Sequence, residues 1–353
     1  MTPEEAESLL EEGSADLIML GRSTLADPFW PVKAQMGHSE DIVPCIRCLQ
    51  CYHVSTDHKN VQCSVNPRFN REKRVPLILP VTGHPKHLVI VGGGPAGITC
   101  ALTASRRGHQ VTLLEKEPVL TGKLNIACHG EHKADLRRFR DYLLTQLRKS
   151  SVTVHTGVLA DTDVVRGLKP DALVIAVGAT PSRIPLPGVD GDNCMQISEF
   201  LQSPDTSLQH YIIIGGGSVG CETALDLAEK GKDVSIIEMT DCLASASNDL
   251  YRLALSEHFA RYDNLHTNLN SACQSIDADG VNVLTNGAST HISGDKVLLS
   301  LGFRPDAKQV SSLYGIVPDT YYVGDCERVA TVAEAVNNAY FIGANVFQEQ
   351  DII

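Results

Sequence analysis

Basic residues are in short supply in this 353-residue chain, which has 30 Lys and Arg against 42 Asp and Glu and a formal net charge of −12. Nucleic acid or an anionic membrane would need a basic face, so we expect neither as a partner. No apolar run approaches the roughly 20 residues that span a bilayer. The first residues, MTPEEAESLLEEG, lack the basic and apolar regions of a secretory signal. These absences predict a cytoplasmic protein.

The clearest positive feature is one unit that occurs twice. Residues 89–116 read VIVGGGPAGITCALTASRRGHQVTLLEK, and residues 212–239 read IIIGGGSVGCETALDLAEKGKDVSIIEM. Each copy has an apolar strand, the pattern G-x-G-x-x-G, a helix rich in small residues, a glycine-containing turn and a second strand that ends in glutamate. This order is typical of the βαβ unit that binds dinucleotides.

The spacing of the glycines and the glutamate has a physical reason. The first glycine permits a tight turn, the second lets the backbone approach a pyrophosphate, and the third allows close packing of helix and sheet. The helix N-terminus stabilises the phosphate charge, and the terminal carboxylate can accept both ribose hydroxyls. Two complete units favour two dinucleotide sites over glycines that serve only turns. The predicted binding residues are Gly92, Gly94, Gly97 and Glu115 in the first copy and Gly215, Gly217, Gly220 and Glu238 in the second.

The order of elements predicts an α/β fold of two Rossmann-like domains, with the second inserted in the first. We expect the first domain over 87–205 and 302–353 and the second over 206–301. A strand ending in Gly-Asp at Asp325 precedes the last predicted helix. Further elements are predicted as helices at Pro3–Gly13, Lys133–Lys149 and Ala330–Val346, and as a buried strand at Ala15–Leu20.

The eleven cysteines are odd in number, and three of them lie within seven residues, which is unlike a secreted disulfide framework. The crowded group has the spacing C-x2-C-x2-C-x11-C. Such thiolates can hold the corners of a 4Fe-4S cluster, whereas structural zinc sites usually use two separated C-x2-C pairs. We favour the cluster, with zinc or free thiols as the alternative. Its predicted ligands are Cys45, Cys48, Cys51 and Cys63.

Several segments together resemble one enzyme group. They are Ala15–Pro28, Lys33, Gly37, Pro44–Cys51 and Cys63–Pro67, the last reading CSVNP. The chain is similar to the C-terminal portion of the iron–sulfur old yellow enzyme-like NADH:flavin oxidoreductases. This group includes 2,4-dienoyl-CoA reductase, 2-enoate reductase and trimethylamine dehydrogenase. The resemblance implies a remnant of a flavin TIM barrel over 1–44, a 4Fe-4S segment over 45–66 and a linker over 67–86.

The resemblance also assigns roles to residues. Gly122, Lys123 and Asp325 would join the first glycine loop in holding FAD, and the second loop with Glu238 would hold NADH. Gly21 and Arg22 match the pair that holds the FMN phosphate in the full barrel. Thr121-Gly122-Lys123 replaces the Gly-Gly-Gln expected beside the flavin.

In the intact family, electrons would pass from NADH through FAD and the 4Fe-4S cluster to FMN, and then to an enoate or dienoyl-CoA alkene. Most of the barrel is expected before Met1. We therefore expect either a truncated chain or a separate barrel polypeptide, and FMN only where that barrel is supplied. The alternatives are a glutamate-synthase-like electron-transfer subunit and an inactive fragment. A thioredoxin-reductase-like enzyme would need C-x-x-C within a nucleotide domain, and neither domain has one.

Overall fold

A computed structural model describes residues 1–347 of the chain, which divide into two compact units. The first unit comprises Met1–Ala179 and the chain from Pro305 onward, and the second comprises Thr180–Arg304. Each unit contains one five-stranded sheet in which all strands are parallel. The predicted α/β class with an inserted second domain is confirmed.

The sheet of the first unit has the strand order β15-β4-β1-β2-β3. Its strands are β1 (His87–Val91), β2 (Gln110–Leu114), β3 (Thr153–His155), β4 (Ala172–Ile175) and β15 (Asp319–Tyr322). Alternate residues of β1 enter two different cores: Leu88 and Ile90 face one side, and Val89 and Val91 face the other. The sheet is therefore covered on both faces, as parallel sheets require.

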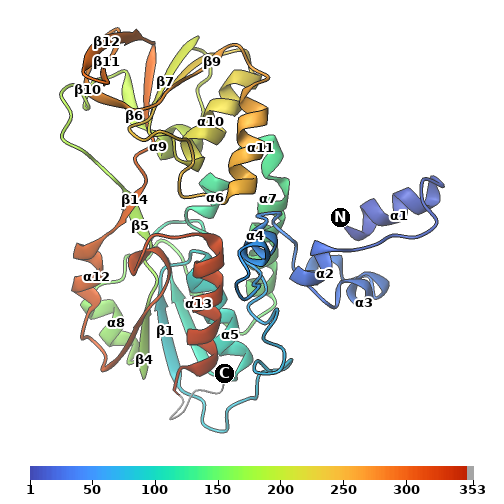
Figure 1. Cartoon of the computed structure of the whole chain (residues 1–353). Coiled ribbons are helices and arrows are strands. Elements are labelled where there is room, and N and C mark those ends of the chain that lie inside the picture. Colours follow the sequence, from blue (N-terminus) through green and yellow to red (C-terminus); the bar gives the residue numbers. More distant parts are fainter. Residues whose placement is uncertain (348–353) are drawn as a thin grey trace. The chain divides into compact units, whose positions relative to one another are not determined.

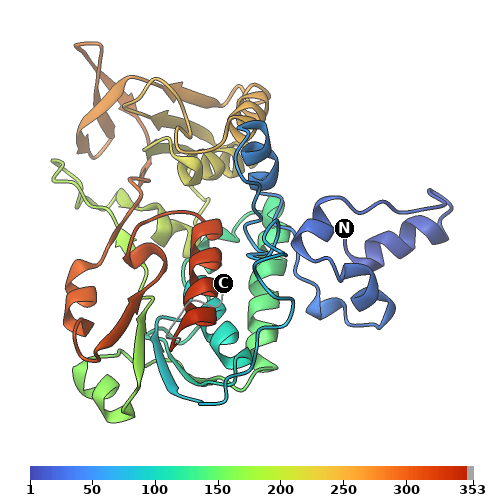
Figure 2. The same cartoon turned by 60° about the horizontal axis from the view of Figure 1, so that its bottom comes forward.

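Three long helices supply one of these cores: α5 (Pro95–Arg106), α7 (Ala134–Arg148) and α13 (Val332–Asn345). The shorter α8 (Thr162–Leu168) and α12 (Ala307–Leu313) supply the other. Figures 1 and 2 show α12 and α13 on opposite sides of this sheet. Helices α5 and α13 can pack closely because Gly343 has no side chain: a Cβ there would lie only 2.7 Å from the Cys100 carbonyl oxygen.

The second unit repeats this plan with the order β6-β13-β7-β8-β9. Ile213 of β7 packs toward the helices, whereas Ile212 and Ile214 pack toward a three-stranded antiparallel sheet. The strands are β6 (Cys194–Gln196), β7 (His210–Ile214), β8 (Asp233–Ile237), β9 (Leu265–Asn268), β10 (Ser271–Asp277), β11 (Gly280–Thr285), β12 (Ala288–Ser293) and β13 (Lys296–Leu299). The helices are α9 (Ile197–Gln202), α10 (Ser218–Glu229) and α11 (Asp249–Phe259).

The bounds of the second unit differ from the predicted 206–301. The unit begins at Thr180 because β6 pairs in parallel with β13 and adds an edge strand to the sheet. It ends at Arg304, within β14 (Phe303–Pro305), which pairs with β5 (Ala179–Pro181) where the chain crosses between the units. The predicted domain consequently omitted its first strand.

The N-terminal region forms α1 (Pro3–Glu11), α2 (Arg22–Ala26), α3 (Trp30–Gln35) and the short η1 (Ser39–Asp41). The predicted helix at its start is confirmed, with a capping box between Thr2 and Glu5. The predicted buried strand Ala15–Leu20 is wrong. Leu17 and Met19 are 88% and 95% exposed, and no strand within residues 1–347 pairs with this segment. An apolar run becomes a strand only when a neighbour satisfies its backbone.

The remaining short elements connect these parts: α4 (Gln50–Thr56), α6 (Leu124–Ala127), η2 (Glu131–Lys133) and η3 (Gly324–Cys326). No helix within residues 1–347 is long and apolar enough to cross a membrane.

Candidate functional site

The first glycine loop connects β1 to α5 and is held tightly at both of its ends. Gly92 has φ +113°, and a Cβ there would lie 2.2 Å from the Ala176 carbonyl oxygen. A Cβ at Gly97 would lie 1.9 Å from the Gly92 carbonyl oxygen. A Cβ at Gly94 would meet no atom within 4 Å. The outer glycines are thus needed for packing, and the middle one leaves open space.

The second glycine loop, between β7 and α10, has the same geometry. Gly215 has φ +107°, and its Cβ would lie 2.3 Å from the Ser300 carbonyl oxygen. A Cβ at Gly220 would lie 2.3 Å from the Gly215 carbonyl oxygen, whereas a Cβ at Gly217 would meet nothing within 4 Å. The open position is again the middle glycine, so the repeat seen in sequence is also a repeat in space.

Both open positions fit a pyrophosphate. Gly94 and Gly217 are the N-caps of α5 and α10, and neither helix has a side-chain cap. The first-turn N–H groups therefore have no side-chain acceptor, and the helix dipole favours an anion there. A backbone that can approach closely, free N–H groups and a positive dipole end are the requirements of a dinucleotide phosphate site.

Each predicted glutamate is fixed by its own loop. Oε2 of Glu115, which is buried, accepts from Gly93 N at 2.6 Å, and Oε2 of Glu238, which is half-buried, accepts from Gly216 N at 2.7 Å. Oε1 of Glu238 also accepts from the N–H and hydroxyl of Thr240, at 2.8 and 2.9 Å. Each carboxylate oxygen has further acceptor capacity, so a ribose hydroxyl can still be bound.

The structure brings the other predicted FAD residues beside the first loop. Thr121 N donates to the Gly93 carbonyl oxygen at 2.7 Å, and a Cβ at Gly122 would lie 3.5 Å from Gly94 Cα. Lys123 Nζ lies 3.1 Å from Oδ2 of Asp325. Burial lowers the pKa of Lys123, and the Asp325 carboxylate opposes that shift. The seven predicted FAD residues therefore lie around the N-terminal end of α5: Gly92, Gly94, Gly97, Glu115, Gly122, Lys123 and Asp325.

The four predicted cluster ligands lie in the same unit and differ in exposure. Cys48 is exposed, Cys45 and Cys51 are half-buried, and Cys63 is buried. Burial raises the pKa of Cys63 to about 11, with neighbouring thiols adding to the shift. Burial also raises the pKa of Cys45 and Cys51, and the guanidinium of Arg22 partly opposes this. The four thiols thus interact with one another and with a nearby cation.

The spacing of these sulfurs bears on which metal they suit. Zinc–sulfur bonds of about 2.3 Å in a tetrahedron would place ligand sulfurs roughly 3.8 Å apart. Among residues 1–347, no three of the cysteines have sulfurs within 4.8 Å of one another. The only such group of potential ligands in this range is His38, Glu40 and Asp41, and Lys149 pairs with both carboxylates. Within the described residues, no three of these sulfurs are therefore spaced as the ligands of one zinc ion would be.

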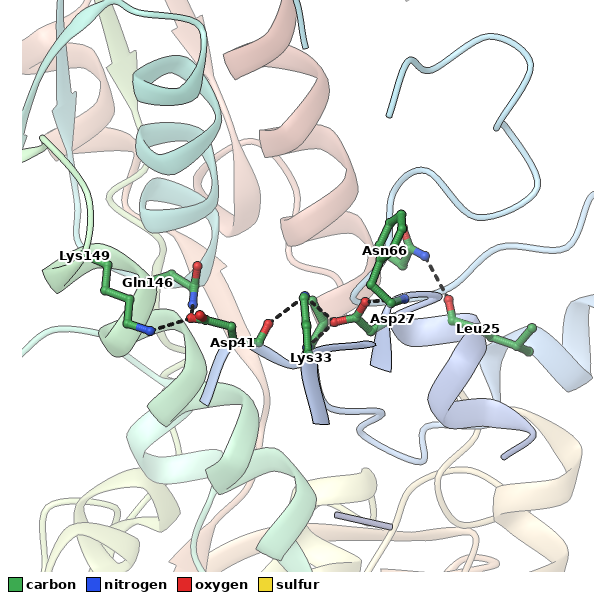
Figure 3. A network of polar contacts seen from close by, with 9 residues as sticks. Leu25, Asp27, Lys33, Asp41, Asn66, Gln146 and Lys149 are labelled. Atoms are coloured by element: carbon green, nitrogen blue, oxygen red, sulfur yellow. Dashed lines mark hydrogen bonds and ion pairs between the residues drawn. The ribbon is translucent and has the colours of Figure 1, made fainter. Parts of the chain in front are cut away.

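Both ends of the cysteine segment are fixed by one polar network, shown in Figure 3. The buried Asp27 accepts from Lys33 Nζ at 2.6 Å and from Val43 N, two residues before the first cysteine, at 2.9 Å. At the other end, Asn66 Nδ2 donates to the Leu25 carbonyl oxygen at 2.9 Å.

The network continues to α7. Lys33 Nζ donates to the Asp41 carbonyl oxygen at 2.8 Å, and the Asp41 side chain accepts from Gln146 and Lys149 of the α7 region (Figure 3). Residues 25–43 therefore hold the cysteine segment against the first nucleotide unit.

Gly21 and Arg22, the predicted FMN phosphate residues, line a cavity of about 590 Å³ that also reaches Cys45 and Arg138. The side chain of Arg22 is exposed. Because Gly21, Arg22 and Cys45 line the same cavity, the pair lies beside the cysteine segment.

Two residues beside the cysteines were not predicted. Ser64 Oγ lies 3.1 Å from Cys48 Sγ, and Nδ2 of the buried Asn337 donates to the Cys63 carbonyl oxygen at 3.1 Å. Ser64 lies within the CSVNP motif, where its position next to Cys63 was the available signal. No sequence signal connects Asn337 of α13 to a residue 274 positions earlier.

With this geometry in place, comparison with known proteins identifies the family. Residues 86–339 match the pyridine nucleotide-disulphide oxidoreductase family. The chain belongs to this family. It is 34% identical to an NADH oxidase of Thermoanaerobacter brockii, over 96% of this chain and 53% of that protein. It is 33% identical to a bilirubin reductase of Mediterraneibacter gnavus, over 98% of this chain and 54% of that protein.

The fold comparison agrees. The structure of a 2-naphthoyl-CoA reductase in complex with 2-naphthoyl-CoA superposes with a TM-score of 0.92 at 29% identity, covering 98% of this chain and 52% of that one. The resemblance to the enoate reductase-like oxidoreductases is therefore confirmed. The chain spans about half the length of the curated relatives it matches.

Proposed function

We propose that this chain is an NADH-dependent flavin and iron–sulfur electron-transfer module. The observation that carries the proposal is that one unit contains both an open glycine loop suited to FAD and four cysteines with the sequence spacing C-x2-C-x2-C-x11-C, among which burial and neighbouring thiols raise the pKa of Cys63. When bound, FAD would accept two electrons as hydride and release them singly, which suits a 4Fe-4S cluster that carries one electron at a time. The residues of the chain bind and orient these groups.

Different residues would bind different parts of FAD. The N-terminus of α5 and the open side of Gly94 would hold the pyrophosphate, and Glu115 would accept the ribose hydroxyls. Gly122, Lys123 and Asp325 would contact the part of FAD beyond the pyrophosphate, since Gly122 lies next to Gly94 and the adjoining Lys123 forms an ion pair with Asp325. Gly92 and Gly97 support the loop through their close packing.

The second unit would bind NADH through the equivalent residues. Gly217 and the N-terminus of α10 would hold the pyrophosphate, with Gly215 and Gly220 supporting the turn. Glu238 would accept the adenosine ribose hydroxyls. Its negative charge repels a 2′-phosphate, and the following Met239, Thr240 and Asp241 supply no cation to neutralise one. We therefore propose NADH rather than NADPH as the donor.

The whole protein's reaction is a further part of the proposal. The relatives that span about twice this length include a cinnamate reductase of Clostridium sporogenes, 28% identical over 98% of this chain. By this likeness, electrons would continue to FMN and an activated alkene when the flavin barrel is supplied, in the same or a separate polypeptide. Gly21 and Arg22 would then contact the FMN phosphate, beside the cysteine segment.

Cofactor analysis of anaerobically purified protein tests the proposal directly. Flavin released by denaturation is identified by chromatography, and iron and acid-labile sulfide are assayed chemically. We expect FAD and about four irons per chain, and NADH should bleach both the flavin absorption and the broad cluster absorption. Stoichiometric zinc without sulfide would contradict the proposed cluster. A purified chain without flavin would contradict the first proposed step, the transfer of hydride from NADH to FAD.

A further inference from the structure

Ser64 makes a contact that the proposed electron path does not use. Its hydroxyl lies 3.1 Å from the sulfur of Cys48, which comes 16 residues earlier in the chain. The Ser64 side chain is buried, at 3% exposure, whereas Cys48 is the exposed member of the four cysteines. Within residues 1–347, the Cys48 sulfur is the one hydrogen-bond partner of the buried Ser64 hydroxyl.

The sulfur side of this contact is held in place by its backbone. Arg47 and Leu49, on either side of Cys48, have φ +50° and +57°, in the left-handed region that ordinary side chains rarely adopt. Leu49 is also the N-cap of α4. Such strain persists only where the surroundings determine the conformation, and it is frequent at ligand-holding sites. The backbone on both sides of Cys48 is therefore held in one conformation, from which the Cys48 sulfur contacts the Ser64 hydroxyl.

The hydroxyl side is equally well fixed. The preceding residue, Cys63, is buried, and its carbonyl oxygen accepts from Nδ2 of Asn337 on α13. Asn337 Oδ1 accepts in turn from Arg71 Nη1 at 3.1 Å, and Val65 after Ser64 is buried. The hydroxyl is thus presented from a rigid backbone anchored to a long core helix, and both partners of the contact are preorganised.

We infer that Ser64 tunes the reduction potential of the centre held by the cysteines, by donating a hydrogen bond to Cys48 Sγ. The inference rests on the proposed 4Fe-4S cluster. A thiolate bound to iron carries no proton, so Ser64 is then the donor. Its hydrogen bond stabilises the more negative, reduced state over the oxidised state and raises the potential, since hydrogen bonds to the sulfurs are one of the determinants of cluster potential.

The experiment compares holoprotein variants of the full chain. Ser64→Ala removes the hydroxyl, and Ser64→Thr keeps it. Ser55→Ala is a matched control that removes an exposed hydroxyl from α4, one that forms no hydrogen bond to a cysteine sulfur within residues 1–347. Iron and sulfide content are measured first, and the midpoint potential is then followed by EPR during stepwise reduction with dithionite. We expect a more negative potential in Ser64→Ala at unchanged iron content, and the original potential in the other two variants.

The outcomes separate this inference from the proposed function. Absence of iron and sulfide from the unsubstituted chain would overturn the proposed cluster and the tuning role with it. Full iron content with an unshifted or more positive potential in Ser64→Ala would overturn the tuning role alone. If Ser64→Ala loses iron, the comparison passes to Ser64→Val and Ser64→Thr, which match in volume and differ in the hydroxyl. Equal potentials in that pair, or equal failure to bind iron, would likewise overturn the tuning role.

Discussion

Lys123 and Asp325 are 202 positions apart in the chain, yet Nζ of the lysine lies 3.1 Å from Oδ2 of the aspartate. The two side chains are 31% and 25% exposed, so the pair is partly withdrawn from water. Asp325 Oδ1 also accepts from Ala330 N, which connects η3 to the segment before α13. The pair therefore joins the segment after β2 to the start of the last helix, next to the first glycine loop.

This ion pair should be measurable by a double-mutant cycle. Lys123→Met, Asp325→Asn and the double variant should give a coupling energy of about 1 kcal/mol in the free energy of unfolding, because partial burial reduces solvent screening. Urea denaturation of the flavin-free protein provides the measurement. The more exposed pair Lys59 and Asp57, 3.0 Å apart with side chains 71% and 37% exposed, is the control and should give a smaller coupling. Coupling at Lys123 no larger than at this control would contradict the prediction.

Two glycines of the first loop should respond to alanine in different ways. Gly97→Ala would place a Cβ 1.9 Å from the Gly92 carbonyl oxygen, so we expect a loss of stability on the order of a few kcal/mol. Gly94→Ala meets open space and should leave the flavin-free protein as stable as before. Its methyl group would occupy the space proposed for the pyrophosphate, so FAD should dissociate more readily. Thermal unfolding measures the stability of both variants, and equilibrium dialysis measures the FAD affinity of Gly94→Ala. Unchanged FAD affinity in Gly94→Ala would count against the assigned site.

Substitution of one proposed cluster ligand should remove the iron–sulfur cluster without removing FAD. Cys48→Ser should remove the cluster and leave FAD bound, since the cysteine segment lies outside the glycine loop and its strand. Iron content and flavin content, assayed on the same sample, give the answer. Cys242→Ser, at a half-buried position in the second unit, is the matched control and should retain iron. Retention of iron in Cys48→Ser at the level of the control would show that Cys48 is not a ligand.

Nicotinamide preference should depend on Glu238. We expect the unsubstituted chain to favour NADH over NADPH by at least about tenfold in kcat/KM for dye reduction, which corresponds to roughly 1.4 kcal/mol. Glu238→Arg should shift the preference toward NADPH by removing the repulsion and supplying a cation. Glu257→Arg makes the same charge change on the exposed face of α11 and should not alter the ratio. Equal rates with both nucleotides in the unsubstituted chain would falsify the assignment.

The parts of the site that were predictable depend on local sequence. A glycine loop between a strand and a helix is determined by its own residues, so the positions of Gly92, Gly94 and Gly97 and their counterparts followed from spacing alone. The glutamates followed for the same reason, because one βαβ unit contains both the loop and the second strand. The resemblance to the enoate reductase-like oxidoreductases was also readable from short motifs, and the relatives that cover nearly the whole chain confirm it.

Other features required the tertiary structure, because they depend on partners that are distant in sequence. Whether Ala15–Leu20 forms a strand depends on a neighbouring strand, and without one Leu17 and Met19 are exposed. The start of the second unit depends on the pairing of β6 with β13, about a hundred residues later in the chain. The sequence by itself determined two nucleotide-binding folds and a group of four thiols. Only packing decided that Asn337 contacts Cys63 and that Ser64 faces Cys48, because hydrogen bonds across such separations are selected by the assembled core.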